Sequence, residues 1–297
     1  MHQKTTVRRK DFRFQHRLRV RWAEVDMQKI VFNAHYLMYF DTAMGDYWRA
    51  LALPYEASML ALGGDLYVKK ASLEYHGSAR YDDQLDIGLR CTKIGNSSIL
   101  FTAGIFRSDD LLVSAELLYV FADPLTQKSQ AVPTNLRAIL DGFEAGEPML
   151  KVVAGPWSEL REAARSLRSE VFLQEQRIPI ELEWDDADEA ALHAVAFNHL
   201  GAAVATGRLL QHSRGIGKIG RMAVTRVLRG TGAGRQILQT LVQAATHRGD
   251  RELLLHAQTS AKGFYQAQGF ATRGELFDEA GIEHIEMFKT LNPAELT

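Results

Sequence analysis

Two segments of the chain place reactive or anion-binding groups directly before a predicted helix. The first runs from Arg21 to Tyr36 and sets one carboxylate, Asp26, between the end of a strand and the start of a helix. Thioester hydrolysis uses such a layout, because it needs a nucleophile or general base on one side of the carbonyl carbon and oxyanion donors on the other. Free N–H groups in the first helical turn, aided by the helix dipole, are such donors.

Three other interpretations of this segment stay open. Asp is a favoured N-cap and turn residue, so Asp26 taken alone is more often structural than catalytic. Glu24 is a rival base, although we expect it to be a solvent-facing carboxylate at a strand end. His35 can also assist catalysis, but a histidine at the start of a helix is more often a hydrogen-bonded structural residue.

The second segment has the layout of a pyrophosphate-binding turn. A predicted strand at 217–224 leads to the loop Arg229-Gly230-Thr231-Gly232-Ala233-Gly234, and an amphipathic helix follows from Arg235. Glycines let the backbone approach phosphate oxygens, and N–H groups at the helix start point toward them. No Lys-Ser/Thr pair follows the glycines, as a Walker loop requires, and the spacing is not that of a dinucleotide-binding turn.

The elements that must position Asp26 have the pattern of an antiparallel sheet and one long helix. Residues 65–121 read as strands, and apolar side chains alternate most clearly at 85–91 and 111–121. Turn signals at 95–96 and 108–110 separate these runs, which indicates a meander with one buried face. Residues 35–51 precede the meander and have the apolar density of a helix wrapped by a sheet.

Short apolar strands alternate with helices in the second half, a pattern typical of an α/β domain. Strands are predicted at 194–197, 202–210, 219–224 and 253–256, and helices at 160–171 and 237–245. A stretch rich in glycine and proline, from Gly142 to Pro156, separates the two patterns. Because 297 residues exceed the usual size of one core, we expect two domains, at 1–145 and 150–297.

Composition excludes several classes of protein. Thirty-five basic and thirty-six acidic residues leave a formal charge of -1, which lacks the positive field of a general nucleic-acid binder. The single cysteine, Cys91, is expected in the core, and it permits neither an internal disulfide nor a thiolate metal cluster. No apolar run approaches the ~20 residues of a membrane span. We therefore expect a cytoplasmic protein with no metal, no nucleic-acid partner and no membrane partner.

The first segment resembles the hotdog-fold thioesterases of the 4-hydroxybenzoyl-CoA thioesterase type. Their motif is an Asp, a short turn, a Val-aromatic pair and an Asn/His-x-Asn/His-Tyr run, here Asp26, Val31-Phe32 and Asn33-Ala34-His35-Tyr36. The likeness continues through most of residues 12–140. It implies an α+β hotdog domain in which Asp26 is the nucleophile or general base and the N–H of Asn33 polarises the thioester carbonyl. Many relatives carry Gly where this chain has Lys29, which bears on the turn that aims Asp26.

The second segment matches the Gln/Arg-x-x-Gly-x-Gly/Ala signature of GNAT acyltransferases, and the likeness covers nearly all of residues 151–290. Residues 220–224 resemble that family's splayed fourth strand, whose backbone pairs with the pantetheine arm of acyl-CoA. The resemblance implies that Tyr265 is the general acid that protonates the departing CoA thiolate. It also implies a coenzyme A site made of Met222, Val224, Arg229, Gly230, Gly232, Gly234 and Arg235.

The acceptor side of this half is less defined by sequence. Residues 168–193 resemble a GNAT subgroup of uncertain acceptor. Asp185, Asp186 and Asp188 could draw in an ammonium acceptor or take its proton, and an acidic run is equally compatible with a solvated loop. His256 is a further candidate base acting through a water, and a strand histidine bonded to its neighbours is at least as compatible with the sequence.

Acyl-CoA is the substrate that both resemblances imply, with no other cofactor. Our first hypothesis is a bifunctional enzyme that hydrolyses acyl-CoA in the first half and transfers an acetyl or acyl group to a small-molecule or peptide amine in the second. A second hypothesis treats one half as an acyl-CoA-binding or dimerisation module. A third is a non-enzymatic acyl-CoA sensor or scaffold. We expect a homo-oligomer through the hotdog half, because a single hotdog sheet leaves an edge strand and one face of the cleft unfinished.

Overall fold

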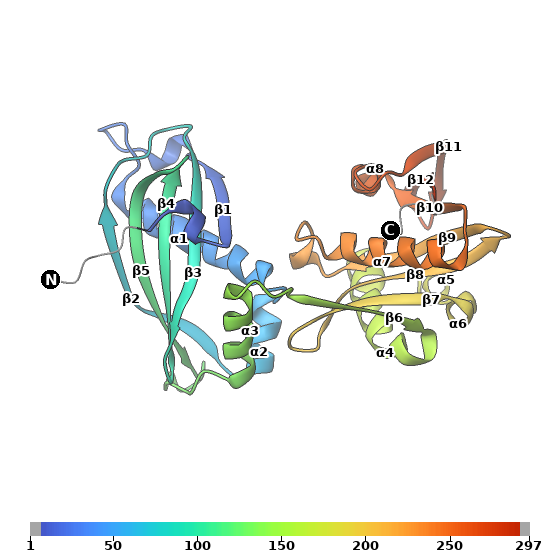
Figure 1. The fold of residues 1–297 in the computed structure, drawn as a ribbon, viewed down its shortest axis with the longest axis horizontal. Helices are drawn as coiled ribbons and strands as arrows, with labels where there is room; N and C mark the ends of the chain where they lie inside the picture. Colours follow the sequence, from blue (N-terminus) through green and yellow to red (C-terminus); the bar gives the residue numbers. More distant parts are fainter. Residues whose placement is uncertain (1–6, 292–297) are drawn as a thin grey trace. The chain divides into compact units, whose positions relative to one another are not determined.

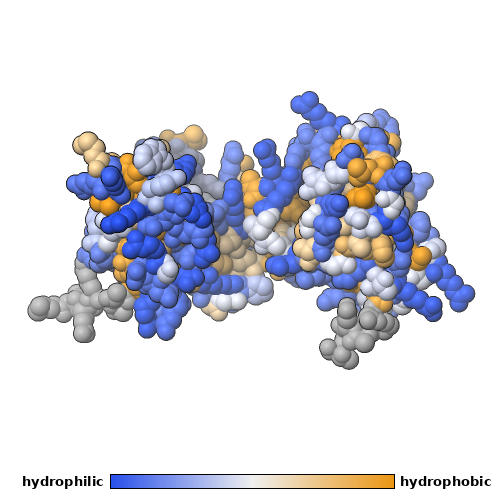
Figure 2. Space-filling view, turned by 90° about the horizontal axis from the view of Figure 1, so that it is seen from above, coloured by the Kyte–Doolittle hydropathy of each residue, from blue (hydrophilic) through white to orange (hydrophobic). Residues whose placement is uncertain are grey.

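The computed structural model describes residues 7–291, which form two compact units divided between Met149 and Leu150 (Figure 1). We call residues 7–149 the first unit and residues 150–291 the second unit. Each has its own β-sheet and its own buried side chains. Polar residues cover most of the surface in the view of Figure 2, and smaller apolar patches lie among them. Within the described residues, no helix has the length and apolar character needed to cross a membrane.

An antiparallel sheet of five strands forms one layer of the first unit. Its order is β1-β3-β4-β5-β2, so β1 and β2 are the edge strands. The strands are β1 (Phe14–Arg19), β2 (Asp65–Tyr75), β3 (Gln84–Ile94), β4 (Ser98–Arg107) and β5 (Asp110–Ala122). The predicted alternation is clearest at 113–121 of β5, where every second side chain is buried. The meander expected from the sequence is therefore present.

The long helix α1 (Asn33–Ala50) packs along one face of this sheet (Figure 1). It begins two residues before the predicted start. Its buried side chains recur at helical spacing, and they are Tyr36, Tyr39, Phe40, Ala43, Met44, Tyr47 and Trp48. The ring of Tyr47 makes edge-to-face contacts with Phe14 of β1 and Phe101 of β4, both at a centroid distance of 5.4 Å. These contacts fix the helix, and with it the segment that precedes the helix.

Shorter helices complete the first unit. They are η1 (Arg9–Asp11), η2 (Trp22–Glu24), α2 (Tyr55–Leu62) and α3 (Thr134–Glu144). The helix η2 is a single 3-10 turn between β1 and the loop that carries Asp26. Helix α3 packs on the same side as α1, because the Phe143 ring also contacts Tyr47, at a centroid distance of 5.3 Å.

A mixed sheet of seven strands forms the second unit, in the order β11-β12-β10-β9-β8-β7-β6. The strands are β6 (Leu150–Pro156), β7 (Leu192–Asn198), β8 (Ala203–Ser213), β9 (Ile216–Val224), β10 (Glu252–Gln258), β11 (Ala271–Glu279) and β12 (Ile282–Thr290). Neighbours are antiparallel except β9 and β10, which run parallel. A parallel pair needs a crossover connection, and the helix α7 (Ala233–Arg248) supplies it.

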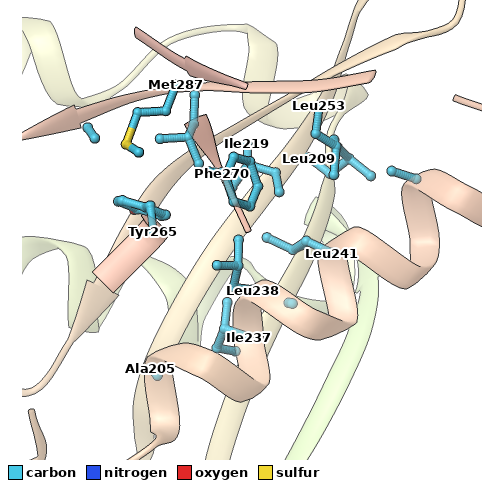
Figure 3. Close-up of a cluster of buried hydrophobic side chains, with 14 of the residues drawn as sticks. Ala205, Leu209, Ile219, Ile237, Leu238, Leu241, Leu253, Tyr265, Phe270 and Met287 are labelled. Carbon is cyan, nitrogen blue, oxygen red and sulfur yellow. The ribbon is translucent and has the colours of Figure 1, made fainter. Parts of the chain in front are cut away.

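Helix α7 is the helix predicted after the glycine-rich loop. Leu238 and Leu241 of α7 point toward the sheet and join one buried cluster with Ile219 and Leu253 (Figure 3). The other helices are α4 (Trp157–Arg168), the π-helix η3 (Ser169–Glu175), α5 (Ile180–Glu183), α6 (Ala187–Ala190), η4 (Arg226–Leu228), η5 (Thr259–Ala261) and α8 (Lys262–Gln266). The buried cluster around Leu238 and Ile219 anchors the start of α7 against β9, and this contact determines the position of the glycine-rich loop.

Candidate functional site

In the first unit, Asp26 lies in a tight loop between η2 and α1. Backbone hydrogen bonds from Asp26 N to Ile30 O and from Lys29 N to Asp26 O, both 2.9 Å, close the loop. The half-buried Asp26 carboxylate accepts one hydrogen bond through Oδ1, from the Gln28 N–H at 2.8 Å. Its Oδ2 has no partner within residues 7–291 and is therefore available for chemistry outside the loop.

Many relatives carry glycine at the position of Lys29, and the lysine adopts the backbone conformation that glycine favours in such a turn. Its φ is 60°, in the left-handed region. A non-glycine residue there costs roughly 1–2 kcal/mol, which the hydrogen bonds of the loop offset. The lysine therefore leaves the loop closed around Asp26.

Asn33 is the first residue of α1, and its backbone N–H has no hydrogen-bond partner in the described chain. The N-cap residue, Phe32, supplies no side-chain cap, so the positive end of the helix dipole is open at this point. The hydroxyl of Tyr75 donates to Asn33 O at 3.2 Å and holds the residue in place. A free amide at a helix start is a suitable donor for an oxyanion.

Glu24 is not the solvent-facing carboxylate that we expected. It is 3% exposed, and it accepts hydrogen bonds from the Arg21 N–H, the Arg21 guanidinium and the Tyr39 hydroxyl, each at 2.7 Å. Burial alone would raise the pKa of this carboxyl, but the hydrogen bonds outweigh it and lower the pKa below its usual value. Its backbone oxygen also accepts the Phe32 N–H. Glu24 therefore braces the loop and has no free oxygen with which to act as a base.

Two further residues of the first unit have surroundings typical of structural roles. His35 is half-buried, and its ring packs edge-to-face on Phe32 at a centroid distance of 6.0 Å. Cys91, expected in the core, is half-buried on β3, and burial raises the pKa of its thiol to about 12. A thiol that stays protonated at neutral pH is a poor nucleophile.

In the second unit, β9 and β10 separate part of the way along their length. Their parallel pairing covers residues 216–219 of β9 and 252–255 of β10, whereas the strands continue to Val224 and Gln258. Beyond the paired part, the edge of β9 that faces β10 has backbone donors and acceptors without a strand partner. An extended ligand with amide groups can pair with such an edge.

A β-bulge shapes this open part of β9. Arg221 and Met222 together lie opposite the single residue Gly207 of β8, and Arg221 takes a φ of 51°. A Cβ at Gly207 would stand 2.5 Å from Met222 Sδ, so only glycine leaves room for the methionine. Sequence analysis did not identify Gly207, because no local pattern reveals which side chain crosses over it.

The loop after β9 forms a cradle of backbone amides at the start of α7. Gly230 and Gly232 have φ values of 84° and 97°, which strongly favour glycine. The N–H groups of residues 232–235 have no hydrogen-bond partner within the described residues. Four free amides at the positive end of a helix dipole are donors suited to phosphate oxygens.

A cavity of about 630 Å³ extends from the open strand to this cradle, and we call it the cradle cavity. Its lining includes every residue predicted to bind coenzyme A, namely Met222, Val224, Arg229, Gly230, Gly232, Gly234 and Arg235. Two hydrogen bonds of 2.7 Å commit Arg229 to Glu175 of the π-helix. The exposed Arg235 forms no ion pair in residues 7–291. Arg229 therefore fixes the loop, and Arg235 is the cation that remains available to an anionic ligand.

A second cavity, of about 450 Å³, shares part of its lining with the first, and we call it the adjoining cavity. The shared residues are Gln176, Met222, Gln258, Ala261 and Tyr265. Gln258 of β10 donates to Gln176 Oε1 at 3.0 Å and ties the strand to the segment after the π-helix. No sequence pattern indicated this glutamine pair, because its members are far apart along the chain.

Tyr265 of α8 lies where the two cavities share their lining. It is 8% exposed, and its ring contacts Phe264 and Phe270 edge-to-face at 4.9 and 6.0 Å. Burial raises the pKa of the phenol to about 12, so the hydroxyl keeps its proton at neutral pH. The hydroxyl makes no hydrogen bond to any described residue. It is therefore a proton donor without a competing protein partner.

Asp185 and Asp188 are not the free acceptor-binding carboxylates that the acidic run suggested. They belong to an ion-pair network in which Arg168 pairs with Glu183 and Asp188, Arg208 with Asp185 and Asp188, and Arg221 with Glu183 and Asp185; Asp185 lies at its exposed edge and Asp188 is buried. The hydrogen bond from Arg208 lowers the pKa of Asp185. Asp186 is the N-cap of α6 and does not line the adjoining cavity. Residues 7–291 contain no group of three or more His, Cys, Asp or Glu side chains arranged to hold a metal ion.

Comparison with known families agrees with both units. A family model described as the thioesterase superfamily matches residues 28–114, and one described as the GNAT acetyltransferase domain matches residues 163–291. The chain therefore belongs to the thioesterase superfamily through its first unit and to the GNAT acetyltransferases through its second. The predicted fold class, a hotdog domain followed by a GNAT domain, is confirmed.

Individual relatives each match less than half of the chain. YjcF of Bacillus subtilis, an uncharacterized N-acetyltransferase, is 34% identical over 142 residues, which are 48% of this chain and 99% of that protein. YbgC of Escherichia coli O157:H7, an acyl-CoA thioester hydrolase, is 30% identical over 122 residues, 41% of this chain and 90% of its own length. The solved structure of Escherichia coli ElaA is 30% identical over 48% of this chain and 99% of its own, with a TM-score of 0.44.

Proposed function

We propose that this chain is a bifunctional acyl-CoA enzyme. The first unit hydrolyses acyl-CoA thioesters, and the second transfers an acetyl or acyl group from coenzyme A to an amine. The observation that carries the proposal is the position of Tyr265, which lines both the cradle cavity and the adjoining cavity at the opening between β9 and β10. A thioester bound across this opening would present its sulfur to a protonated phenol.

Coenzyme A fits the cradle cavity by its chemistry. Its pyrophosphate would accept hydrogen bonds from the free amides of residues 232–235, with Arg235 as counter-ion. Its pantetheine arm carries amide groups that would pair with the open edge of β9. The amine would approach from the adjoining cavity and attack the carbonyl carbon. As the C–S bond breaks, the attacking nitrogen would lose a proton to solvent, the thiolate would take the Tyr265 proton, and the phenolate would regain one from solvent.

The first unit supports hydrolysis through Asp26 and Asn33. Asp26 has a carboxylate oxygen without a protein partner, and Asn33 has a free N–H at the start of a helix. Either Asp26 attacks the thioester carbon directly, or it removes a proton from the water that attacks, while the Asn33 amide stabilises the oxyanion. The relative YbgC is an acyl-CoA thioester hydrolase, which favours the same reaction for this unit.

A homo-oligomer belongs to the proposal. Large apolar side chains are exposed on the loop and helix start around Asp26, among them Trp22 at 74% and Met27 at 100%. Val68, at 56%, lies on β2, an edge strand of the sheet. A second copy of the first unit would cover these side chains and finish the cleft around Asp26. The same surface favours the alternative in which the first unit only dimerises the chain and the second unit alone is catalytic.

A thiol-release assay tests the proposal. The full chain would be incubated with acyl-CoA thioesters of increasing chain length, with and without a panel of amines. We expect CoA release without amine for at least one thioester, and additional release that depends on an amine. Release only with amine would leave the first unit as a dimerisation or binding module. Binding of acyl-CoA with no release under either condition would make the protein a sensor and refute both activities.

A further inference from the structure

One histidine in the adjoining cavity is held in a defined hydrogen-bonding geometry. His256 lies on β10, just beyond the part that pairs with β9, and it lines the adjoining cavity. Its side chain is 27% exposed, so the ring is held by the protein and reaches the cavity. The edge-to-face contact with Phe277, at a centroid distance of 4.9 Å, fixes the plane of the ring.

Two charged neighbours define which ring nitrogen of His256 carries the proton. Nδ1 lies 2.7 Å from Oε2 of Glu279, at the end of β11, and the hydrogen bond from His256 lowers the pKa of that carboxyl. An ionised carboxylate only accepts hydrogen bonds, so Nδ1 is the donor. Nε2 lies 3.5 Å from Nζ of Lys218 on β9, and an ammonium group only donates. The lone pair of the neutral ring is therefore on Nε2.

We propose that His256 is the general base of the acyl transfer, with Glu279 and Lys218 as the residues that position it. This assignment rests on the proposed function of the second unit. The acceptor is then an amine that enters the adjoining cavity as an ammonium ion, such as a primary alkyl amine. Nε2 of His256 takes one proton from the ammonium, directly or through one water, and frees the nitrogen lone pair for attack.

The proton and electron count closes with Tyr265. The amine nitrogen forms the C–N bond, the C–S bond breaks, and its electron pair leaves on the sulfur of coenzyme A. Tyr265 protonates that sulfur, and the attacking nitrogen, which carries a second proton after the C–N bond forms, gives that proton to solvent. The phenolate regains one proton from solvent, and the proton on His256 returns to solvent. An alkylammonium ion and acyl-CoA thus give amide, free coenzyme A and one proton.

Two other carboxylates that line this cavity are already ion-paired with arginines. Glu183 is 2% exposed, and its two oxygens pair with Arg168 and Arg221. Asp185 pairs with Arg208 and Arg221.

Further groups near His256 have protein partners as well. His284 of β12, which also lines the cavity, donates from Nδ1 to Ile282 O of its own strand; its ring stacks on Phe277 and the residue is buried, whereas His256 is half-buried. Glu286 faces His256 in the strand register and pairs with Arg273. Among the described residues that line the adjoining cavity, His256 therefore combines a half-buried, ion-paired ring with a basic Nε2 whose one protein hydrogen bond, from Lys218, is long at 3.5 Å.

Kinetics as a function of pH test the assignment. The full chain would carry Asp26→Asn to suppress hydrolysis by the first unit, and the amine-independent rate would be subtracted. Acetyl-CoA and the amine that gives the fastest release are the probes. We expect His256→Gln to lower kcat by ~10²- to 10⁴-fold, to leave KM for acetyl-CoA within about twofold, and to abolish the acidic limb of the pH profile. His212→Gln, at an exposed position on β8, is the matched control and should change neither.

The positioning role of Glu279 has its own measurement. Glu279→Gln removes the charge beside the imidazolium that forms during proton transfer, so kcat should fall less than in His256→Gln and the acidic limb should move to lower pH. Added imidazole should restore part of the rate of His256→Ala. In wild-type protein labelled with ¹⁵N-histidine, the His256 signals should report a proton on Nδ1.

Each outcome separates the assignment from the proposed function. If wild type releases CoA in an amine-dependent way and folded His256→Gln does so within about threefold of that rate, His256 is not the base and the acyltransferase function stands. A neutral His256 with its proton on Nε2 would overturn the assignment even if the variant did not fold. If wild type releases no CoA with any amine, the acyltransferase function and the base assignment both fail.

Discussion

Gly232→Ala is the substitution that tests the phosphate cradle most specifically. Gly232 is the N-cap of α7 and has a φ of 97°. An L-residue in this region costs roughly 1–2 kcal/mol, so the backbone of the variant would relax toward negative φ. Such a rotation turns the amides at the helix start away from the position that a pyrophosphate would occupy. The added methyl itself meets only the flexible end of the Arg235 side chain, at 3.3 Å, so backbone strain is the main effect.

The expected loss of binding follows from the number of hydrogen bonds affected. A hydrogen bond to a charged group contributes about 1.5–3 kcal/mol. Loss of one amide–phosphate bond should therefore raise Kd for coenzyme A about 10- to 100-fold. Calorimetric titration of the full chain with coenzyme A would measure this for the site in the second unit, and any site in the first unit should keep its affinity.

Gly249→Ala is the matched control for this prediction. Gly249 caps the other end of the same helix, has a φ of 88°, and has no atom within 4 Å of the position of an added Cβ. Both variants should lose a similar amount of stability, but only Gly232→Ala should bind coenzyme A more weakly. Equal affinities for wild type and both variants, with the stability loss observed in each, would refute the cradle.

Two further predictions concern the first unit. Glu24→Gln should lower the free energy of unfolding by about 2 kcal/mol at pH 7, because a buried charge-assisted network is broken. Folding lowers the pKa of Glu24. The difference in free energy of unfolding between wild type and variant should therefore be complete above the pKa that this carboxyl has in the unfolded state, and it should shrink as the pH falls through the pKa of the folded state. Urea unfolding against pH would show this, and an equal loss in the exposed control Glu116→Gln would contradict it. Sedimentation velocity should give at least a dimer, and a dilute monomer with full hydrolytic activity would exclude the oligomer.

Local periodicity explains why much of the fold could be predicted. Helix α1 and strand β5 bury one face each, so their apolar residues recur at spacings that a short window of sequence displays. The glycine-rich loop was also readable, because positive φ values at Gly230 and Gly232 restrict the residue type directly. Strand β6 and the hairpin of β11 and β12 were missed; β11 is mostly exposed, so its side chains follow no buried alternation.

Partners that are distant in the sequence explain what could not be predicted. From its neighbours in the sequence, Glu24 is expected to be a surface carboxylate. In the folded protein, helix α1 places Tyr39 over it, and the Tyr39 hydroxyl donates to the Glu24 carboxylate. From its neighbours in the sequence, Asp185 is expected to belong to a solvated acidic run. In the folded protein it pairs with Arg208 and Arg221, which lie on two neighbouring strands. The pairing of His256 with Glu279 likewise forms only when folding brings the end of β11 close to His256 of β10. In each case the sequence identified a residue but not its partner, and the partner determines its chemistry.

Whether the chain has two independent acyl-CoA sites is tested most directly by a pair of variants in one thiol-release assay. Asp26→Asn should lower amine-independent CoA release by at least ~10²-fold and leave amine-dependent release unchanged, because it removes the proposed nucleophile or base of the first unit. Tyr265→Phe should do the reverse, because it removes the proposed proton donor of the second unit. If Tyr265→Phe abolished the amine-independent release, or if folded Asp26→Asn retained it within a few-fold, the claim of two sites would be contradicted.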